Sequence, residues 1–66
     1  MNGTLIKANG AQAKHFSSLL SPTRNFQPTG KRGEYFMAAA DEVVALRDAE
    51  FLRENGAVVL AVVENQ

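Results

Sequence analysis

The order of apolar and polar residues along the chain predicts a small mixed fold that begins with a strand. Residues 4–8, "TLIKA", are apolar or β-branched apart from one lysine, and the Asn9-Gly10 pair that follows is a turn signal. From Ala11 onward, apolar residues recur every three or four positions. This spacing predicts a short amphipathic helix that is capped by Asn9 and ends at Ser21-Pro22. A second strand, paired with the first through the turn, is the alternative for this segment.

The next section, about residues 21–33, is predicted to be an irregular loop. It contains two prolines and two glycines among mostly polar residues. Proline and glycine interrupt helices and strands alike, so no regular element is expected here.

The stretch from Glu34 to Asn55 supports two interpretations. Its content of Ala, Glu, Leu, Arg and Met, followed by Gly56, is typical of one long helix. On such a helix Asp41 and Asp48 would fall within the apolar face, where an unpaired carboxylate is costly to bury. The interpretation that we favour removes this conflict. It makes "EYFM" and "EVVAL" extended and starts a short helix, "DAEFLREN", at Asp48.

The last segment, Ala57–Val63, "AVVLAVV", is an uninterrupted apolar run. Such a run predicts a strand that is covered on both faces and therefore central in its sheet. The whole pattern predicts an α+β fold, with residues 1–66 as one domain that contains a two- to four-stranded sheet and one or two short helices. Short helices cover one face, so a second copy or a protein partner is expected on the other. The alternative is that the loop of residues 21–33 folds back over that face.

The composition limits which stabilising sites and which cellular locations are expected for this domain. A chain of 66 residues without cysteine and with one histidine excludes disulfides and argues against a structural zinc site. Its first residues lack a basic start followed by a long apolar core, and no apolar run approaches the ~20 residues that span a bilayer. We therefore expect an intracellular protein without a membrane anchor.

The neutral net charge hides an asymmetry between the two halves of the chain. Residues 1–33 contain five basic residues and no acid, whereas residues 34–66 contain seven acids and two arginines. This asymmetry predicts either charged partners for each half or head-to-tail association of identical copies. The alternative is that folding interleaves the halves and neutralises them.

The Thr29-Gly30-Lys31 core invites comparison with a phosphate-binding P-loop. That motif requires a glycine five residues before its Gly-Lys pair and a Ser or Thr after the Lys. Asn25 and Arg32 occupy these two positions, so the match fails at both. Catalysis also has little support, because His15 has only Ser17 and Ser18 nearby and helix neighbours one or two apart do not face each other. No enzyme activity, cofactor or metal is expected.

Two sets of side chains remain as candidate partner sites. A basic loop could contact phosphates or an acidic protein, with an aromatic ring among Phe26, Tyr35 and Phe36 stacking on a base. The near-neutral pI makes nucleic acid the weaker partner. An acidic surface could instead occupy a basic groove by imitating nucleic acid. The basic set is Lys14, Arg24, Lys31, Arg32 and Tyr35, and the acidic set is Glu42, Asp48, Glu50, Glu54 and Glu64.

The stretch "ADEVVALRDAEFLRENGAVV", residues 40–59, resembles short open reading frames of tailed-phage genomes. These often combine a valine-rich strand, a D-A-E helix start and an L-x-x-x-G-A-V ending, matched here by Val43, Val44, Asp48, Ala49, Glu50, Leu52, Gly56, Ala57 and Val58. The resemblance implies a small head, neck or tail component, or an accessory factor that blocks a host defence system. It carries over no site residues.

These observations together favour a non-enzymatic, phage-type interaction protein that works by burying its surface against itself or another protein. An anti-CRISPR-like inhibitor of a host nucleic-acid-targeting complex is the alternative, and a nucleotide or phosphate binder ranks below both. The expected location is the host cytoplasm or the virion, and no membrane contact is expected.

Overall fold

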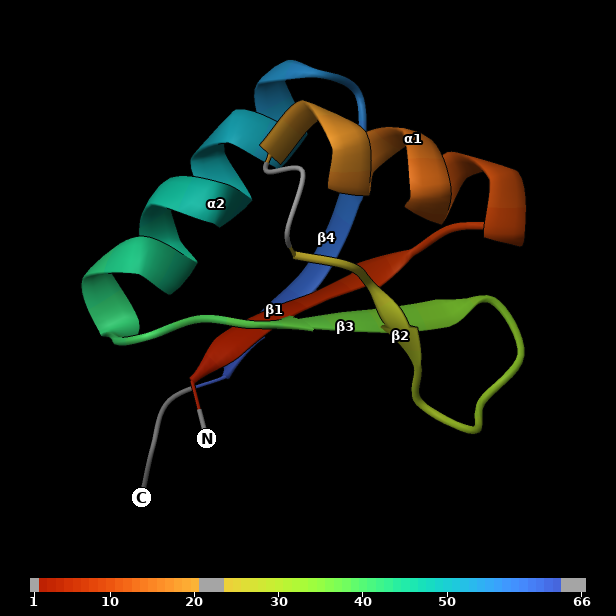
Figure 1. Ribbon diagram of the computed structural model, residues 1–66, viewed down its shortest axis with the longest axis horizontal. Coiled ribbons are helices and arrows are strands. Elements are labelled where there is room, and N and C mark those ends of the chain that lie inside the picture. The colour runs from red at the N-terminus through yellow and green to blue at the C-terminus, as the bar shows by residue number, and fades with distance from the viewer. Residues whose placement is uncertain (1, 21–23, 64–66) are drawn as a thin grey trace.

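A computed structural model describes residues 2–20 and 24–63, which form four strands and two helices (Figure 1). Ser21-Pro22, predicted as the end of the first helix, and Glu64, predicted as part of the acidic set, lie outside these ranges. In chain order the elements are β1 (Gly3–Lys7), α1 (Gly10–Leu20), β2 (Gln27–Pro28), β3 (Glu34–Ala38), α2 (Glu42–Glu54) and β4 (Val58–Val63).

The strands form one antiparallel sheet in the order β2-β3-β1-β4, and both helices lie on the same side of it (Figure 1). Each helix joins two parallel strands that have one other strand between them. This order of elements is that of the ferredoxin-like, or split βαβ, arrangement. The predicted α+β class is confirmed, with four strands and two helices.

Local capping signals explain where α1 begins. The Asn9 Oδ1 atom accepts a hydrogen bond from the backbone N–H of Gln12 at 2.8 Å, and the Gln12 Oε1 atom accepts one from the Asn9 N–H at 3.1 Å. This reciprocal pair is a capping box that satisfies two backbone donors at once. The helix predicted from Asn9 is therefore confirmed.

The second helix begins earlier than the sequence suggested. Asp41, not Asp48, is its N-cap, with Oδ1 accepting from the Val44 N–H at 2.9 Å. The "EVVAL" segment is helical, so its prediction as an extended segment was wrong, whereas "EYFM" does form a strand. At the other end, the helix is terminated by Gly56, which has a φ of +86°. The Gly56 N–H donates a hydrogen bond to the Arg53 carbonyl, and the Ala57 N–H donates one to the Leu52 carbonyl. These two bonds make a Schellman motif.

Asp48 lies in the middle of α2 and is buried, because a distant arginine compensates its charge. The Arg24 Nη2 atom lies 2.6 Å from Asp48 Oδ2 and donates a second hydrogen bond to the Ala38 carbonyl at 2.8 Å. The objection to a carboxylate on the apolar face therefore does not hold here, since the carboxylate is paired.

The core lies between the helices and the sheet. Its fully buried side chains are Ile6, Met37, Leu52 and Thr4. The Thr4 hydroxyl donates to the Ala45 carbonyl at 3.1 Å and so ties β1 to α2. Residues 24–33 are more ordered than predicted. Phe26 is buried, its N–H donates to the Ser17 hydroxyl at 3.0 Å, and Gln27–Pro28 pairs with β3.

β4 is an edge strand, so its prediction as a central strand was wrong. It pairs with β1 alone, and the register shifts between Leu5 and Ile6, which leaves Leu60 as an extra, bulged residue. The bulge places Val59 and Val62 both on the helix side, opposite Ile6 and Thr4. The apolar run therefore reflects a bulged strand with one uncovered face rather than a strand covered twice.

Candidate interaction surface

The face of the sheet that points away from the helices has no covering element in the described residues (Figure 1). Because Thr4 and Ile6 point toward the helices, the alternating residues of the sheet point the other way. Six apolar side chains make up this uncovered face: Leu5, Phe36, Ala38, Val58, Ala61 and Val63. Its only charged residues on β1 and β3 are Lys7 and Glu34, which lie directly across from each other.

Phe36 is the central aromatic ring of the uncovered face. A Cβ atom placed on Gly3 would lie 2.2 Å from the Phe36 Cζ atom and 2.5 Å from the Met37 carbonyl oxygen. The ring therefore lies directly over the backbone of Gly3, in the space that a side chain would fill. This close packing of a ring on a strand glycine holds Phe36 against the sheet rather than free in solvent.

The two edges of the sheet differ in length and composition. β2 has two residues, one of which is Pro28, and a short edge strand with proline cannot easily accept another strand. β4 has six residues, all of them apolar and none of them Pro or Gly. Its exposed fractions reach 56% at Val58 and 43% at Leu60. An apolar edge of this kind is a template for strand pairing.

The predicted basic loop is mostly a β-hairpin connection. The Thr29 N–H donates a hydrogen bond to the Glu34 carbonyl, and the Glu34 N–H donates one to the Lys31 carbonyl. Gly30 and Gly33, within this turn, both have positive φ. A turn between two strands is not the strand-to-helix turn of a P-loop, which agrees with the mismatch in sequence. Lys14, Lys31 and Arg32 are exposed, while Tyr35 lies on the helix side of β3 against the core.

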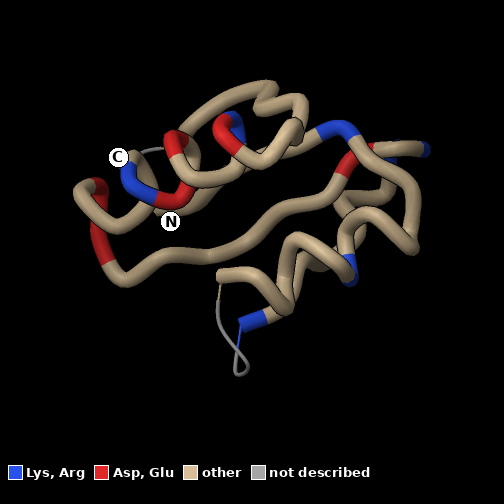
Figure 2. The backbone as a smooth tube through the Cα atoms, turned by 90° about the horizontal axis from the view of Figure 1, so that it is seen from above, with Lys and Arg blue, Asp and Glu red and all other residues tan. Residues whose placement is uncertain are grey.

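The predicted acidic set does not form one surface. Glu42, Glu50 and Glu54 are exposed on α2, whereas Asp48 is paired with Arg24 inside the molecule. Figure 2 shows that blue segments accompany the red ones along α2, since Arg47 and Arg53 belong to the same helix. The acidic charge of α2 is therefore partly balanced locally.

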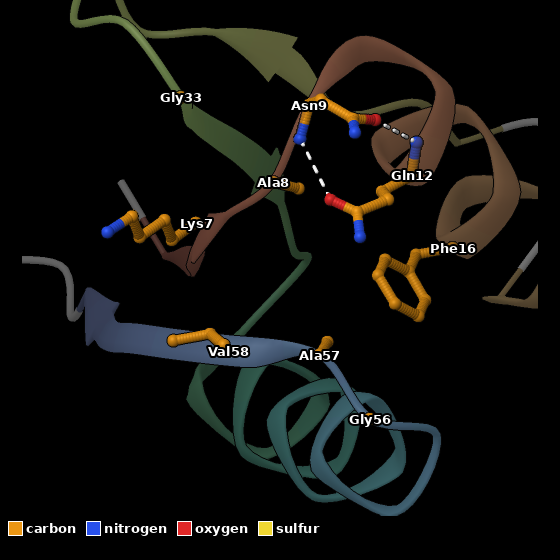
Figure 3. A pocket seen from close by; sticks show the side chains of 9 residues that line it. All are labelled: Lys7, Ala8, Asn9, Gln12, Phe16, Gly33, Gly56, Ala57 and Val58. Atoms are coloured by element: carbon orange, nitrogen blue, oxygen red, sulfur yellow. Dashed lines mark hydrogen bonds between the residues drawn. The ribbon is translucent and has the colours of Figure 1, made fainter.

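A cleft of about 490 Å³ opens where the start of α1 meets Gly33 and the Gly56–Val58 segment (Figure 3). Its polar lining residues are Lys7, Asn9 and Gln12, of which Asn9 and Gln12 bind each other in the capping box, and the Phe16 ring points into the cleft. The cleft therefore combines an apolar wall with one charged residue, Lys7.

The described residues show no assembled catalytic or metal site. The hydroxyls of Ser17 and Ser18 donate to the backbone carbonyls of Ala13 and His15, and the His15 ring lies against Phe16. Across residues 2–20 and 24–63, no three His, Asp or Glu side chains lie close enough together to hold a metal ion. Over the same ranges, no helix is long and apolar enough to cross a bilayer.

Comparison with protein-family models, curated proteins and solved structures finds no significant match for this chain. The evidence for the candidate surface therefore comes from the structure of this chain alone.

Sequence reasoning predicted that one sheet face would need a partner, but it named only charged residues and Tyr35 as candidate sites and did not identify the residues of that face. Leu5, Phe36 and Ala61 belong to three different strands, and only the pairing of β1 with β3 and β4 brings them together. The one available signal was the shortage of helix to cover a second sheet face, which predicted that a partner is needed there.

Proposed function

We propose that this protein is a non-enzymatic interaction module that binds a protein partner through the uncovered face of its sheet. The observation that carries the proposal is the row of Leu5, Phe36 and Ala61 across three neighbouring strands, with no covering element in the described residues. Contiguous apolar surface on a small domain is costly in water and typical of protein contact sites.

The chemistry of this face suits a protein better than a nucleic acid. Binding single strands requires several aromatic rings for stacking and a positively charged groove. The uncovered face has one ring, Phe36, and its Lys7 lies opposite Glu34. An apolar patch with balanced charge at its border is the pattern of a protein interface.

The setting that we propose is the one implied by the sequence, a small phage-encoded virion or accessory protein in the host cytoplasm or the virion. The same apolar face suits either a head, neck or tail contact or the blocking of a host defence complex. The identity of the captured partner separates the two.

The test is site-specific photo-crosslinking in cells that encode the protein, with the crosslinking residue placed at Leu5. We expect one discrete crosslinked protein. The matched control places the same residue at Glu54, which is exposed on α2 on the opposite side of the molecule. No product from position 5, or the same product from both positions, contradicts the proposal.

A further inference from the structure

The cleft beside the start of α1 lies where two connections of the chain leave the sheet. The chain passes from β1 into α1 through Ala8-Asn9 and from α2 into β4 through Gly56-Ala57, and Gly33 closes a third side (Figure 3). The volume of about 490 Å³ falls within the range of about 300–1,000 Å³ that is usual for small-molecule sites. The cleft is therefore large enough for a small organic molecule.

The floor of the cleft is part of the hydrophobic core. Ala8 and Phe16 belong to the core cluster, with exposed fractions of 7% and 8%, and Ala57 packs against the cluster. Figure 3 shows that the Phe16 ring points into the cleft. A ring and small aliphatic side chains favour an apolar ligand group, and above all an aromatic one that packs against Phe16.

The walls of the cleft are held in place by hydrogen bonds within the protein. The Ala8 N–H donates to the Gly33 carbonyl at 2.9 Å, and the Ala57 N–H donates back to the end of α2 at 2.9 Å. The capping box holds Asn9 and Gln12 on the remaining side. A ligand therefore needs to order little of the protein, which lowers the free-energy cost of binding.

The charges around the cleft favour an anion. Of the nine described residues that line it, Lys7 is the only charged one. Lys31 and Arg32 are exposed in the turn that leads to Gly33, and the next residue, Glu34, lies directly across from Lys7. Three cations therefore accompany one acid at this end of the sheet, in a molecule whose formal net charge is zero.

The donors of the cleft suit a carboxylate better than a phosphate. A phosphate site in a protein usually has several free backbone N–H groups that converge on the anion. Here the N–H groups of Asn9 and Gln12 are occupied in the capping box, and the N–H of Ala8 is bonded to Gly33. Lys7 is left as the charged donor, which matches a ligand with a single negative charge.

Phe16 and Lys7 lie on different sides of the cleft. Figure 3 shows the Phe16 ring inside and the Lys7 side chain extending away from that ring. Lys7 is exposed and lies beside Val58, so its ammonium group stays in solvent at the mouth. A ligand with its apolar group inward and its charge at the mouth meets both side chains without burying the charge.

We propose that this cleft is a binding site for a small aromatic carboxylate. The ring of the ligand packs against Phe16, and its carboxylate pairs with Lys7 at the mouth. For a probe of about ten non-hydrogen atoms we expect a dissociation constant of about 1 mM, because an exposed ion pair adds little. This site does not depend on the proposed function.

The first test is a titration of isotope-labelled protein with phenylacetate, followed through the backbone amide signals by NMR. We expect saturable shifts at Ala8, Gln12 and Ala57. Phenylacetamide has the same size without the charge and should bind about threefold more weakly, and acetate, which lacks the ring, should cause no saturable shift. An unchanged spectrum at about 10 mM phenylacetate overturns the proposal. Equal affinity for phenylacetamide overturns the preference for an anion.

The second test removes the charge at the mouth. Lys7→Met keeps an unbranched apolar side chain and should weaken phenylacetate binding about threefold, to the level of phenylacetamide. The matched control is Lys14→Met, an exposed lysine on α1. Lys14 lies two positions from both Gln12 and Phe16, hence on the opposite side of the helix, and should have no effect. An equal loss in both variants overturns the role of Lys7.

The third test fills the cleft from its apolar wall. Val59 faces the helices, so Ala57, two residues earlier, faces them too and lines the cleft. Ala57→Leu should weaken phenylacetate binding about tenfold. The control is Ala40→Leu, an exposed residue before α2 and about 20 Å of helix away from Gly56. Unchanged affinity in Ala57→Leu overturns the site, and thermal unfolding checks that each variant folds.

These measurements are separate from those for the uncovered face. Absence of phenylacetate binding with retained crosslinking at position 5 removes this inference alone. The reverse outcome removes only the proposed function.

Discussion

At the scale of single residues, the contact between Arg24 and Asp48 connects two parts of the chain that no local pattern relates. Asp48 has a side-chain exposure of 10%, and Arg24 lies 2.6 Å from it while also donating to the Ala38 carbonyl of β3. A buried carboxylate without its partner is strongly destabilising. The stability of α2 in this position therefore depends on a residue outside the helix.

Replacing Arg24 alone should expose this dependence. We expect Arg24→Ala to lower the free energy of unfolding by about 2 kcal/mol, because Asp48 remains buried without a partner. Urea unfolding measures the change. Arg47→Ala, an exposed arginine on α2, is the control and should stay within about 0.5 kcal/mol of the original protein.

The double variant Arg24→Ala with Asp48→Ala completes a mutant cycle. Removing both charges should cost less than the sum of the two single changes, since no charge is then left buried. Additive losses would show that the two side chains do not act as a pair.

At the scale of elements, three signals that are local in sequence were read correctly, whereas the equally local Asp41 cap of α2 was missed. The Asn9 cap of α1, the "EYFM" strand and the terminating role of Gly56 each depend on residues within a few positions of one another. The error at Asp48 involves a distant partner. Asp41 and Asp48 both resemble helix caps in sequence, and only the distant Arg24 makes burial of Asp48 acceptable.

The position of β4 illustrates the same limit. An apolar run does not indicate which strands will pair with it. The bulge at Leu60 cannot be predicted from the sequence either, because every residue of the segment is apolar and no alternation is visible. The edge position is fixed by pairing with β1, more than fifty residues earlier in the chain. Of the candidate surface, only the need for a partner could be predicted.

The assignment of the α2 cap can be tested directly. Asp41→Ala should lower the free energy of unfolding by about 1 kcal/mol, because the N–H of Val44 loses its acceptor. Asp41→Ser should restore most of this loss, since serine caps helices equally well. Thermal unfolding provides the comparison, and an equal loss for both variants would mean that Asp41 does not act as a cap.

At the scale of the whole molecule, folding interleaves the basic and acidic halves of the chain. β1, from the basic half, lies between β3 and β4 of the acidic half, and Arg24 pairs with Asp48 across the same division. The described residues therefore do not form one basic and one acidic surface through which copies could associate head to tail. The exposed charges that remain are distributed over the end of β1, α1, α2 and the β2–β3 turn (Figure 2).

This distribution predicts weak attraction to nucleic acid. With a formal net charge of zero, we expect no salt-dependent change in the fluorescence anisotropy of a labelled single-stranded oligonucleotide. Lys31→Glu combined with Arg32→Glu should leave the crosslink at position 5 unchanged. Tight binding that weakens with salt and is lost in this double variant would instead assign the β2–β3 turn to a nucleic-acid partner.

The pairing of Gly3 with Val63 has a consequence for how the chain can be connected. The last residue of β4 lies beside the first residue of β1 and the two strands run in opposite directions, so a hairpin turn of a few residues could join them. Each half of the chain is itself a strand, a helix and a strand. The architecture is thus a closed cycle of two such units, and the order in which they are translated is a property of the gene rather than a requirement of the fold. A circularly permuted chain that opens at the exposed turn around Gly30 would keep every strand neighbour described above.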